Sequence, residues 1–274
     1  MTKHELWLWV FAVSCSAAIT SPAHAGCFDP RSVIKVMRSP APHGPVILAH
    51  RGLWLKKVAT TGNLPENSIA SLNAAEIAGS PTDLKHCIEA VEMDIKTTKD
   101  NVAVISHDFN LGGATTIPRN NFSAYTNTGD NPRVDAVNFD RFNEIFLRDG
   151  RYFSAPSTLI ATSFKNILDY YYYSRSSSVI ALDIKTKNDA IAVAKILSED
   201  DRDFSHGKTE KLKASDFVIF KLNATIWPDG GEYIQDMKMA GVDTPPMVIV
   251  IYTTNMESAL GCVCICRISM RREF

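Results

Sequence analysis

Short apolar runs recur along the chain, and each of the first four ends in charged or histidine side chains. These four runs cover residues 46–52, 90–96, 102–108 and 179–185. Their length and their content of valine, isoleucine, leucine and alanine are typical of strands buried on both faces of a parallel sheet. With two later runs, strands are expected at residues 46–51, 90–96, 101–107, 179–185, 216–222 and 246–252.

The segments between these strands have helical patterns. Helices are expected at residues 67–78, 162–174, 188–199 and 231–240. Thr162 or Ser163 and then Asn188 are expected to start the second and third helices, and Gly79 and Gly241 to end the first and last. Strands that alternate with helices predict a parallel α/β architecture, whose right-handed crossovers bring the carboxyl ends of the strands to one face.

Residues 109–161 interrupt this alternation. The segment is rich in asparagine, glycine, aspartate, threonine and proline, which predicts a long excursion after the third strand. It is interpreted either as an insertion that contacts a substrate or as a solvated surface loop. The candidates for such contacts, among which the sequence does not choose, are Arg119, Asn120, Tyr125, Arg148 and Arg151.

Length and charge limit the class of protein. The chain has 274 residues, which is enough for one barrel domain but not for a barrel with a second large domain. Its formal net charge of −1 argues against a nucleic-acid partner, because such surfaces are strongly basic. An anionic small molecule would therefore be held by local charges.

Residues 1–25 are interpreted as a signal peptide. Lys3 precedes an apolar stretch at 6–18, and Ala23-His24-Ala25 fits a small-x-small cleavage site. An uncleaved signal anchor is the alternative. Cleavage would leave residues 26–274 as a secreted or periplasmic domain, with no integral membrane segment expected in it.

Export permits disulfide bonds, and five of the six cysteines follow residue 25. Cys27 precedes the first expected strand and Cys87 the second, so a bridge between them is predicted. Cys262, Cys264 and Cys266 alternate, as on one face of a strand; a metal site or a disordered tail are the other interpretations.

The polar ends of the runs carry groups suited to metal-assisted acid/base chemistry. Glu92 and Asp94 are two residues apart, so on a strand they point to the same side, and Asp183 ends the fourth strand. Paired carboxylates on one face need a cation or raised pKa values to coexist, and hard oxygen ligands favour Mg²⁺ or Ca²⁺. The alternative is a set of rim carboxylates that pair with Lys96 and Lys185.

Histidines end the first and third runs. Because histidine titrates near neutral pH, one ring can accept a proton while another donates one. We therefore predict that His50 is a general base and His107 a general acid, with interchangeable roles. His43, His86 and His206 are expected to be structural.

Four sequence pieces resemble the glycerophosphodiester phosphodiesterase family, within the phospholipase C-like phosphodiesterase superfamily of TIM barrels. They are His50-Arg51-Gly52, Pro65-Glu66-Asn67-Ser68, Glu92-Met93-Asp94 and His107-Asp108. The resemblance covers about residues 46–185 and continues more weakly to 252. It implies a TIM-type barrel that cleaves a phosphodiester with a divalent cation.

One position departs from the family pattern. Asp183 stands where the family usually has glutamate. The stretch Leu182-Asp183-Ile184-Lys185-Thr186 is similar to the sphingomyelinase D and phospholipase D toxins, which share the barrel, the metal ligands and the histidine pair.

Further residues are expected to bind substrate. Arg51 offers two parallel donors that match phosphate oxygens, and Lys185 and Lys221 are expected to neutralise charge. Glu66 is expected to bind a glycerol hydroxyl, to help hold the ion or to act only as a helix-start carboxylate. Two neighbours, Asn67 and Ser68, are interpreted as helix caps. The aromatic residues Trp227 and 170–173 are expected to pack.

The resulting hypothesis is an exported, metal-dependent hydrolase that converts glycerophosphodiesters into glycerol 3-phosphate and an alcohol. Its small-molecule substrate is expected to be a glycerophosphodiester or a lysophospholipid. The alternatives are a lyase that forms a cyclic phosphate and an inactive phosphate- or lipid-binding barrel. Six expected strands fall short of the eight in a full barrel, and the tail at 253–274 does not resemble the family. We therefore expect a barrel that is incomplete at its C-terminus, with weak stability and reduced activity.

Overall fold

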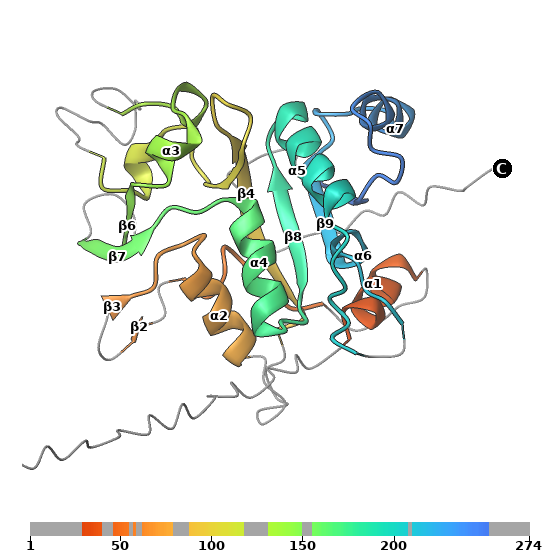
Figure 1. Cartoon of the computed structure of the whole chain (residues 1–274), viewed down its shortest axis with the longest axis horizontal. Helices are drawn as coiled ribbons and strands as arrows, with labels where there is room; N and C mark the ends of the chain where they lie inside the picture. The colour runs from red at the N-terminus through yellow and green to blue at the C-terminus, as the bar shows by residue number, and fades with distance from the viewer. Residues whose placement is uncertain are drawn as a thin grey trace, which may run out of the picture.

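A computed structural model of the chain describes residues 29–39, 46–54, 57–58, 62–78, 88–117, 131–149, 155–207 and 210–251. Its centre is a six-stranded sheet in the order β1-β4-β8-β9-β10, with β5 paired to β4 (Figure 1). The strands are β1 (Leu48–Ala49), β4 (Ala90–Thr97), β5 (Ala103–Ile105), β8 (Val179–Ile184), β9 (Val218–Asn223) and β10 (Met247–Ile251). The mostly parallel α/β fold that the sequence predicts is thereby confirmed.

The third strand runs in the direction opposite to the one expected. β5 pairs with β4 antiparallel, with Ile105 opposite Ile95. The physical reason is the length of the connection: only residues 98–102 separate the two strands, whereas a parallel crossover needs about a dozen residues or more. The chain turns back on itself, and Ser106 donates its backbone N–H to the carbonyl of Asp94 at 3.0 Å.

Strand alternation separates an apolar face from a charged face. On β4, Val91, Met93 and Ile95 pack in the main core, which also takes in residues of the helices α4 (Phe164–Ser174) and α5 (Lys187–Glu199). These helices lie in front of β4 and β8 (Figure 1). Glu92, Asp94 and Lys96 consequently point to the opposite side of the sheet.

The expected helices are present with small shifts. They are α2 (Ile69–Ala78), α4, α5 and α7 (Gly230–Met239). Ser163 caps α4 as predicted, by accepting from the N–H of Asn166. The cap of α5 is Thr186 and not the expected Asn188, because the Thr186 hydroxyl accepts from the N–H of Asp189.

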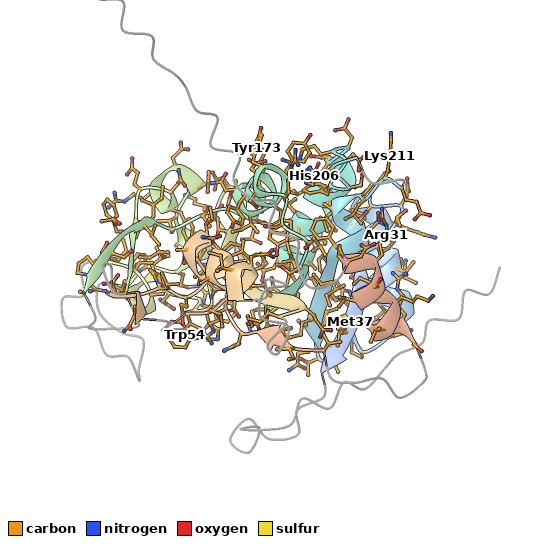
Figure 2. All side chains as sticks on the ribbon, turned by 90° about the horizontal axis from the view of Figure 1, so that it is seen from below. Arg31, Met37, Trp54, Tyr173, His206 and Lys211 are labelled. Carbon is orange, nitrogen blue, oxygen red and sulfur yellow. The ribbon has the colours of Figure 1, made fainter. Side chains whose placement is uncertain are left out.

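The sequence patterns did not predict the helix α1 (Pro30–Arg38). It covers part of the face of the sheet that carries Glu92 and Asp94, called the inner face from here on. Its Val33 and Ile34 pack with Val179, Ala181 and Ile219. The side chain of Arg31 donates to the carbonyls of Glu210 and Lys211, the segment that leads into α6 (Ala214–Phe217). Figure 2 shows Arg31 and Met37 on this helix, with Lys211 nearby. The inner face is thus apolar where α1 packs on it, and charged where Glu92, Asp94 and Lys96 lie.

The described part of the expected excursion has its own small core. It contains η2 (Leu111–Gly113), η3 (Val134–Ala136), α3 (Phe139–Phe142) and the hairpin of β6 (Phe146–Arg148) with β7 (Pro156–Ile160). Leu111, Val134, Phe142 and Leu147 are buried together there. A second hairpin joins β2 (Lys57–Val58) and β3 (Gly62–Asn63).

Among the described residues the sheet does not close, because β1 and β10 lie at its two ends. Several predictions fall outside the described residues: the signal peptide, the Cys27–Cys87 bridge, the cysteines and tail of 253–274, and His43, His86, Arg119, Asn120, Tyr125 and Arg151. No described helix has the length and apolar character needed to cross a bilayer.

Candidate active site

Three carboxylates meet at the middle of the sheet. The register aligns Asp94 of β4 with Asp183 of β8, and Asp183 with Lys221 of β9. Together with Glu92, the two aspartates offer oxygen atoms that all lie within 4.8 Å of one another. Glu92 and Asp94 are buried and Asp183 is half-buried. The row exists because β4, β8 and β9 are adjacent and parallel, and the predicted trio is brought together.

Two lysines lie between these carboxylates. The Nζ of Lys221 is 2.5 Å from Oε1 of Glu92 and 2.9 Å from Oδ2 of Asp183. The Nζ of Lys185 is 2.7 Å from the same Asp183 oxygen and 3.5 Å from Oδ1 of Asp94. Both lysines that the sequence predicts therefore belong to the cluster.

The loop after β1 brings Arg51 to the same place. Its guanidinium lies 2.8 Å from Oε2 of Glu66 and 3.4 Å from Oδ2 of Asp94, and its backbone N–H donates to Glu92 at 3.0 Å. Glu66 is buried beside it. In this arrangement Arg51 holds carboxylates in position, and Glu66 neutralises Arg51.

Asn67 contributes contacts that its interpretation as a cap did not include. Its side-chain nitrogen donates to Oδ2 of Asp94, and its oxygen accepts from the Asp94 backbone N–H, both at 3.0 Å. Ser68 is the residue that caps α2, since its hydroxyl accepts from the N–H of Ser71. The interpretation of Asn67 as a cap was therefore wrong, and its place beside Glu66 in the motif of residues 65–68 was the available signal of another role.

We expect Asn67→Ala to lower the free energy of unfolding by about 1–3 kcal/mol, because it leaves the buried Asp94 without two hydrogen bonds. Turnover should fall as well, since Asp94 would lose its fixed orientation. Asn73→Ala is the matched control: Asn73 accepts one hydrogen bond from Tyr170 away from the carboxylates, so this variant should keep its turnover. Equal turnover in the two variants would contradict the positioning role.

Gly52 allows the loop of Arg51 to pack tightly on α2. Its φ is +74°, and a Cβ atom there would lie 2.5 Å from the Ser71 hydroxyl and 2.7 Å from the Ser71 backbone. The predicted His50-Arg51-Gly52 motif thus has a steric basis at its third position.

Gly52→Ala is expected to lower the free energy of unfolding by about 1–3 kcal/mol or more, from backbone strain and overlap together. Gly207→Ala separates the two causes, because Gly207 has a φ of +90° but no described atom within 4 Å of the place that a Cβ would occupy. Chemical denaturation of both variants should show the larger loss for Gly52→Ala, and a smaller loss there would refute the packing argument.

The two predicted histidines both lie near the carboxylates: His50 is beside Glu92, and His107 acts electrostatically on Asp94. His50 follows β1, and its Nε2 is 3.6 Å from Oε2 of Glu92. His107 follows β5, and its Nδ1 is 2.6 Å from Oδ1 of Asp108. Asp108, to which the sequence patterns gave no role, holds the His107 ring; its adjacency in sequence was the available signal.

The electrostatic balance favours charged side chains at the centre. Burial would raise the pKa of Asp94, but His107, Lys185, Asn67 and Arg51 together hold it below its ordinary value. Burial would lower the pKa of Lys221, yet Glu92 and Asp183 raise it above its ordinary value. Carboxylates and ammonium groups thus stabilise one another in their ionised forms.

The alternative interpretation paired the carboxylates with Lys96 as well as Lys185. Among the described residues, Lys96 forms no such ion pair. Its Nζ lies 3.3 Å from the carbonyl of Ile95 and 4.7 Å from the centre of the Phe109 ring. Burial lowers its pKa to about 8. Lys96 is thus a buried lysine without an ion pair among the described side chains.

Other candidates lie elsewhere. Arg148 donates to the carbonyl of Thr115 within the excursion. Trp227 packs as expected, since it is buried against Tyr233 and donates to Asp236. The ring of His206 lies against that of Tyr172 at a tilt of 46°, and the 80% exposed Tyr173 projects from the surface nearby (Figure 2).

Comparison with known sequences identifies the family. The sequence pattern of the glycerophosphoryl diester phosphodiesterase family matches residues 50–227, more than half of the chain. The chain belongs to this family. The resemblance read from the four motifs is confirmed, and the chain is a member of a family of phosphoric diester hydrolases. No curated protein matches the chain.

Solved structures of this family are similar at low identity. The glycerophosphoryl diester phosphodiesterase of Parabacteroides distasonis has 16% identity over 81% of this chain and 68% of its own, with a TM-score of 0.46. The glycerophosphoryl diester phosphodiesterase domain of a Mycobacterium tuberculosis protein has 14% identity over 76% of this chain, with a TM-score of 0.46. The match covers 60% of that domain's chain, so this chain spans less than two thirds of it. An Oleispira antarctica phosphodiesterase, solved in complex with the product sn-glycerol-3-phosphate, has 15% identity over 78% of this chain and 68% of its own, with a TM-score of 0.45.

The carboxylates suit the divalent cation on which the family depends. All three donors are hard oxygen ligands, as Mg²⁺ and Ca²⁺ prefer. Oδ1 of Asp94 is buried and accepts no hydrogen bond from any described residue. Its only described charged partner is the Lys185 ammonium at 3.5 Å. A buried carboxylate oxygen without a hydrogen bond is costly, and a cation among Glu92, Asp94 and Asp183 would offset that cost.

Proposed function

We propose that the chain hydrolyses glycerophosphodiesters to glycerol 3-phosphate and an alcohol. One observation carries this proposal: three carboxylates that can share one cation lie beside His50 and within electrostatic reach of His107, although these residues come from separate parts of the sequence. Cleavage of a phosphodiester requires a base for the attacking hydroxyl, an acid for the leaving alkoxide and positive charge near the phosphate.

Glu92, Asp94 and Asp183 would hold the divalent cation, Mg²⁺ or Ca²⁺. Such an ion neutralises charge on a phosphate oxygen and lowers the pKa of a nearby water or hydroxyl. Asn67 and Arg51 orient Asp94, and Arg51 fixes Glu92 through its backbone N–H. These residues therefore pre-organise the ligands.

The proton transfers are assigned to the two histidines. His50, more exposed and beside Glu92, would accept the proton of the attacking hydroxyl. His107, held by Asp108, would donate a proton to the leaving alcohol. The position of His107 beside the cluster is supported by its electrostatic effect on Asp94.

Lysines 185 and 221 would stabilise the phosphate as negative charge develops on it. Both are half-buried, with 28% and 24% of the side chain exposed, so both can reach a bound anion. Arg51, whose guanidinium already pairs with Glu66, would act on the phosphate through its remaining donors. Lysophospholipids carry a phosphodiester of the same kind and are included as substrates; because their acyl chain stays on the glycerol, hydrolysis would release an acylglycerol phosphate and the head-group alcohol.

Phosphorus NMR of the products tests the proposal. Purified chain is incubated with glycerophosphocholine and, separately, with a lysophosphatidylcholine, in the presence of Mg²⁺ or Ca²⁺. A glycerol 3-phosphate signal from the first substrate supports hydrolysis. A cyclic phosphate signal would replace the proposal with the lyase, and unchanged substrates in all mixtures would favour a non-catalytic binding barrel.

A further inference from the structure

We propose that Lys221 competes with the divalent cation for Glu92 and Asp183, and thereby weakens the affinity of the site for that ion. The inference rests on the proposed function only in that the same carboxylates hold the ion. It assigns to Lys221 a role in setting metal affinity, separate from any contact with substrate.

The first support is geometric. Lys221 lies opposite Asp183 in the register of β8 and β9, so its side chain points to the same side of the sheet. Its Nζ bonds at once to Glu92 and to Asp183, two of the three carboxylates that could hold a metal. An ammonium group thus lies where oxygen ligands would converge on an ion.

The second support is charge. The three carboxylates face three basic groups, on Arg51, Lys185 and Lys221. Arg51 also pairs with Glu66, so a divalent ion approaches a cluster whose negative charge is neutralised mainly by the two lysines. Affinity for hard cations rises with the net negative charge of the ligand set, so each basic neighbour reduces it.

The third support is the sharing of one oxygen. Oδ2 of Asp183 accepts from both Lys185 and Lys221, at 2.7 and 2.9 Å. The side chain of Asp183 is short, so Asp183 can bind an ion most directly by releasing one of these two lysines. Lys221 is the one whose ammonium also bonds to Glu92, which is fully buried and cannot turn to solvent.

Two consequences of opposite sign follow. In the absence of a divalent ion, Lys221 keeps Glu92 and Asp183 from repelling each other, so removing its charge should lower the melting temperature. In the presence of the ion, removing the same charge should strengthen binding. If Lys221 had a merely structural role, removing its charge would lower both the melting temperature and the affinity for the ion.

Isothermal titration calorimetry of Mg²⁺, and separately of Ca²⁺, into the metal-free full chain tests this. We expect Lys221→Met to bind the better of the two ions about tenfold more tightly than the unmodified chain, or more. Lys187→Met is the matched control: Lys187 pairs with Asp236 on the surface, and its variant should bind as the unmodified chain does.

A second variant covers the risk that Lys221→Met does not fold. Lys221→Gln keeps a hydrogen-bond donor near the carboxylates but removes the charge, and it should also bind the ion more tightly. Unchanged or weaker affinity in the folded variants would overturn the proposal, as would the absence of ion binding in every protein.

Melting curves with and without the ion give the second readout. The rise in melting temperature on adding saturating Mg²⁺ or Ca²⁺ should be larger for the charge-removing variants than for the unmodified chain. An equal or smaller rise would overturn the proposal. These measurements need no turnover, so a chain that binds the ion as expected but hydrolyses nothing would refute the proposed function and leave the role of Lys221 intact.

Discussion

His107→Ala is expected to lower turnover of a glycerophosphodiester by about 10²–10⁴-fold, the usual contribution of a general acid or base. His107 is held by Asp108 and lies beside the carboxylate cluster, where a leaving alcohol would need its proton. The side chain is partly exposed, so its removal should leave the melting temperature nearly unchanged. Steady-state kinetics with glycerophosphocholine measures the effect.

His50→Ala should have an effect of the same order, because base and acid are both required. His206→Ala is the control, since His206 packs near Tyr172 away from the cluster and its loss should change turnover little. A variant of either predicted catalytic histidine that retains near-native turnover would show that its role is misassigned. A His206→Ala variant as slow as the other two would point to a general loss of folding.

Removal of divalent cations by a chelator is expected to abolish turnover, and Mg²⁺ or Ca²⁺ should restore it. Without an ion, the described partners of the carboxylates are lysine, arginine, histidine and asparagine side chains, and none of these lowers the pKa of an attacking water as a bound metal does. Turnover is followed by release of glycerol 3-phosphate, with metal content measured on the same samples.

Asp183→Asn should mimic the loss of the ion, because it removes one of the three anionic ligands. Asp236→Asn is the matched control, as Asp236 bonds to Lys187 and Trp227 away from the cluster. Full turnover in protein shown to be metal-free would disprove the metal assignment, as would equal turnover in the two variants.

The carboxylate row could be predicted because it depends only on strand periodicity and on parallel pairing of the strands. Glu92 and Asp94 share a face whenever 90–96 is a strand, and parallel pairing with 179–184 places Asp183 beside them. Boundaries within two residues were sufficient for this, so the small shifts in the caps did not affect the prediction.

Other parts depended on contacts between distant segments, which no local pattern encodes. Asn67 follows a helix start, as a cap would, and only the folded loop shows it bonded to Asp94. α1 has only nine residues, and its place was set by the inner face of a sheet formed much later in the chain. The direction of β5 was predictable from the short connection, but its apolar sequence suits either direction.

The short connection between β4 and β5 also bears on the order of folding. Two proposed ion ligands and the proposed acid lie in one unbroken stretch, 92–108, that forms a local hairpin. Contacts that are close in sequence cost little loop-closure entropy and tend to form early, whereas Asp183 and Lys221 must arrive from distant strands. Half of the catalytic geometry is therefore expected to be in place before the rest of the sheet has docked onto it.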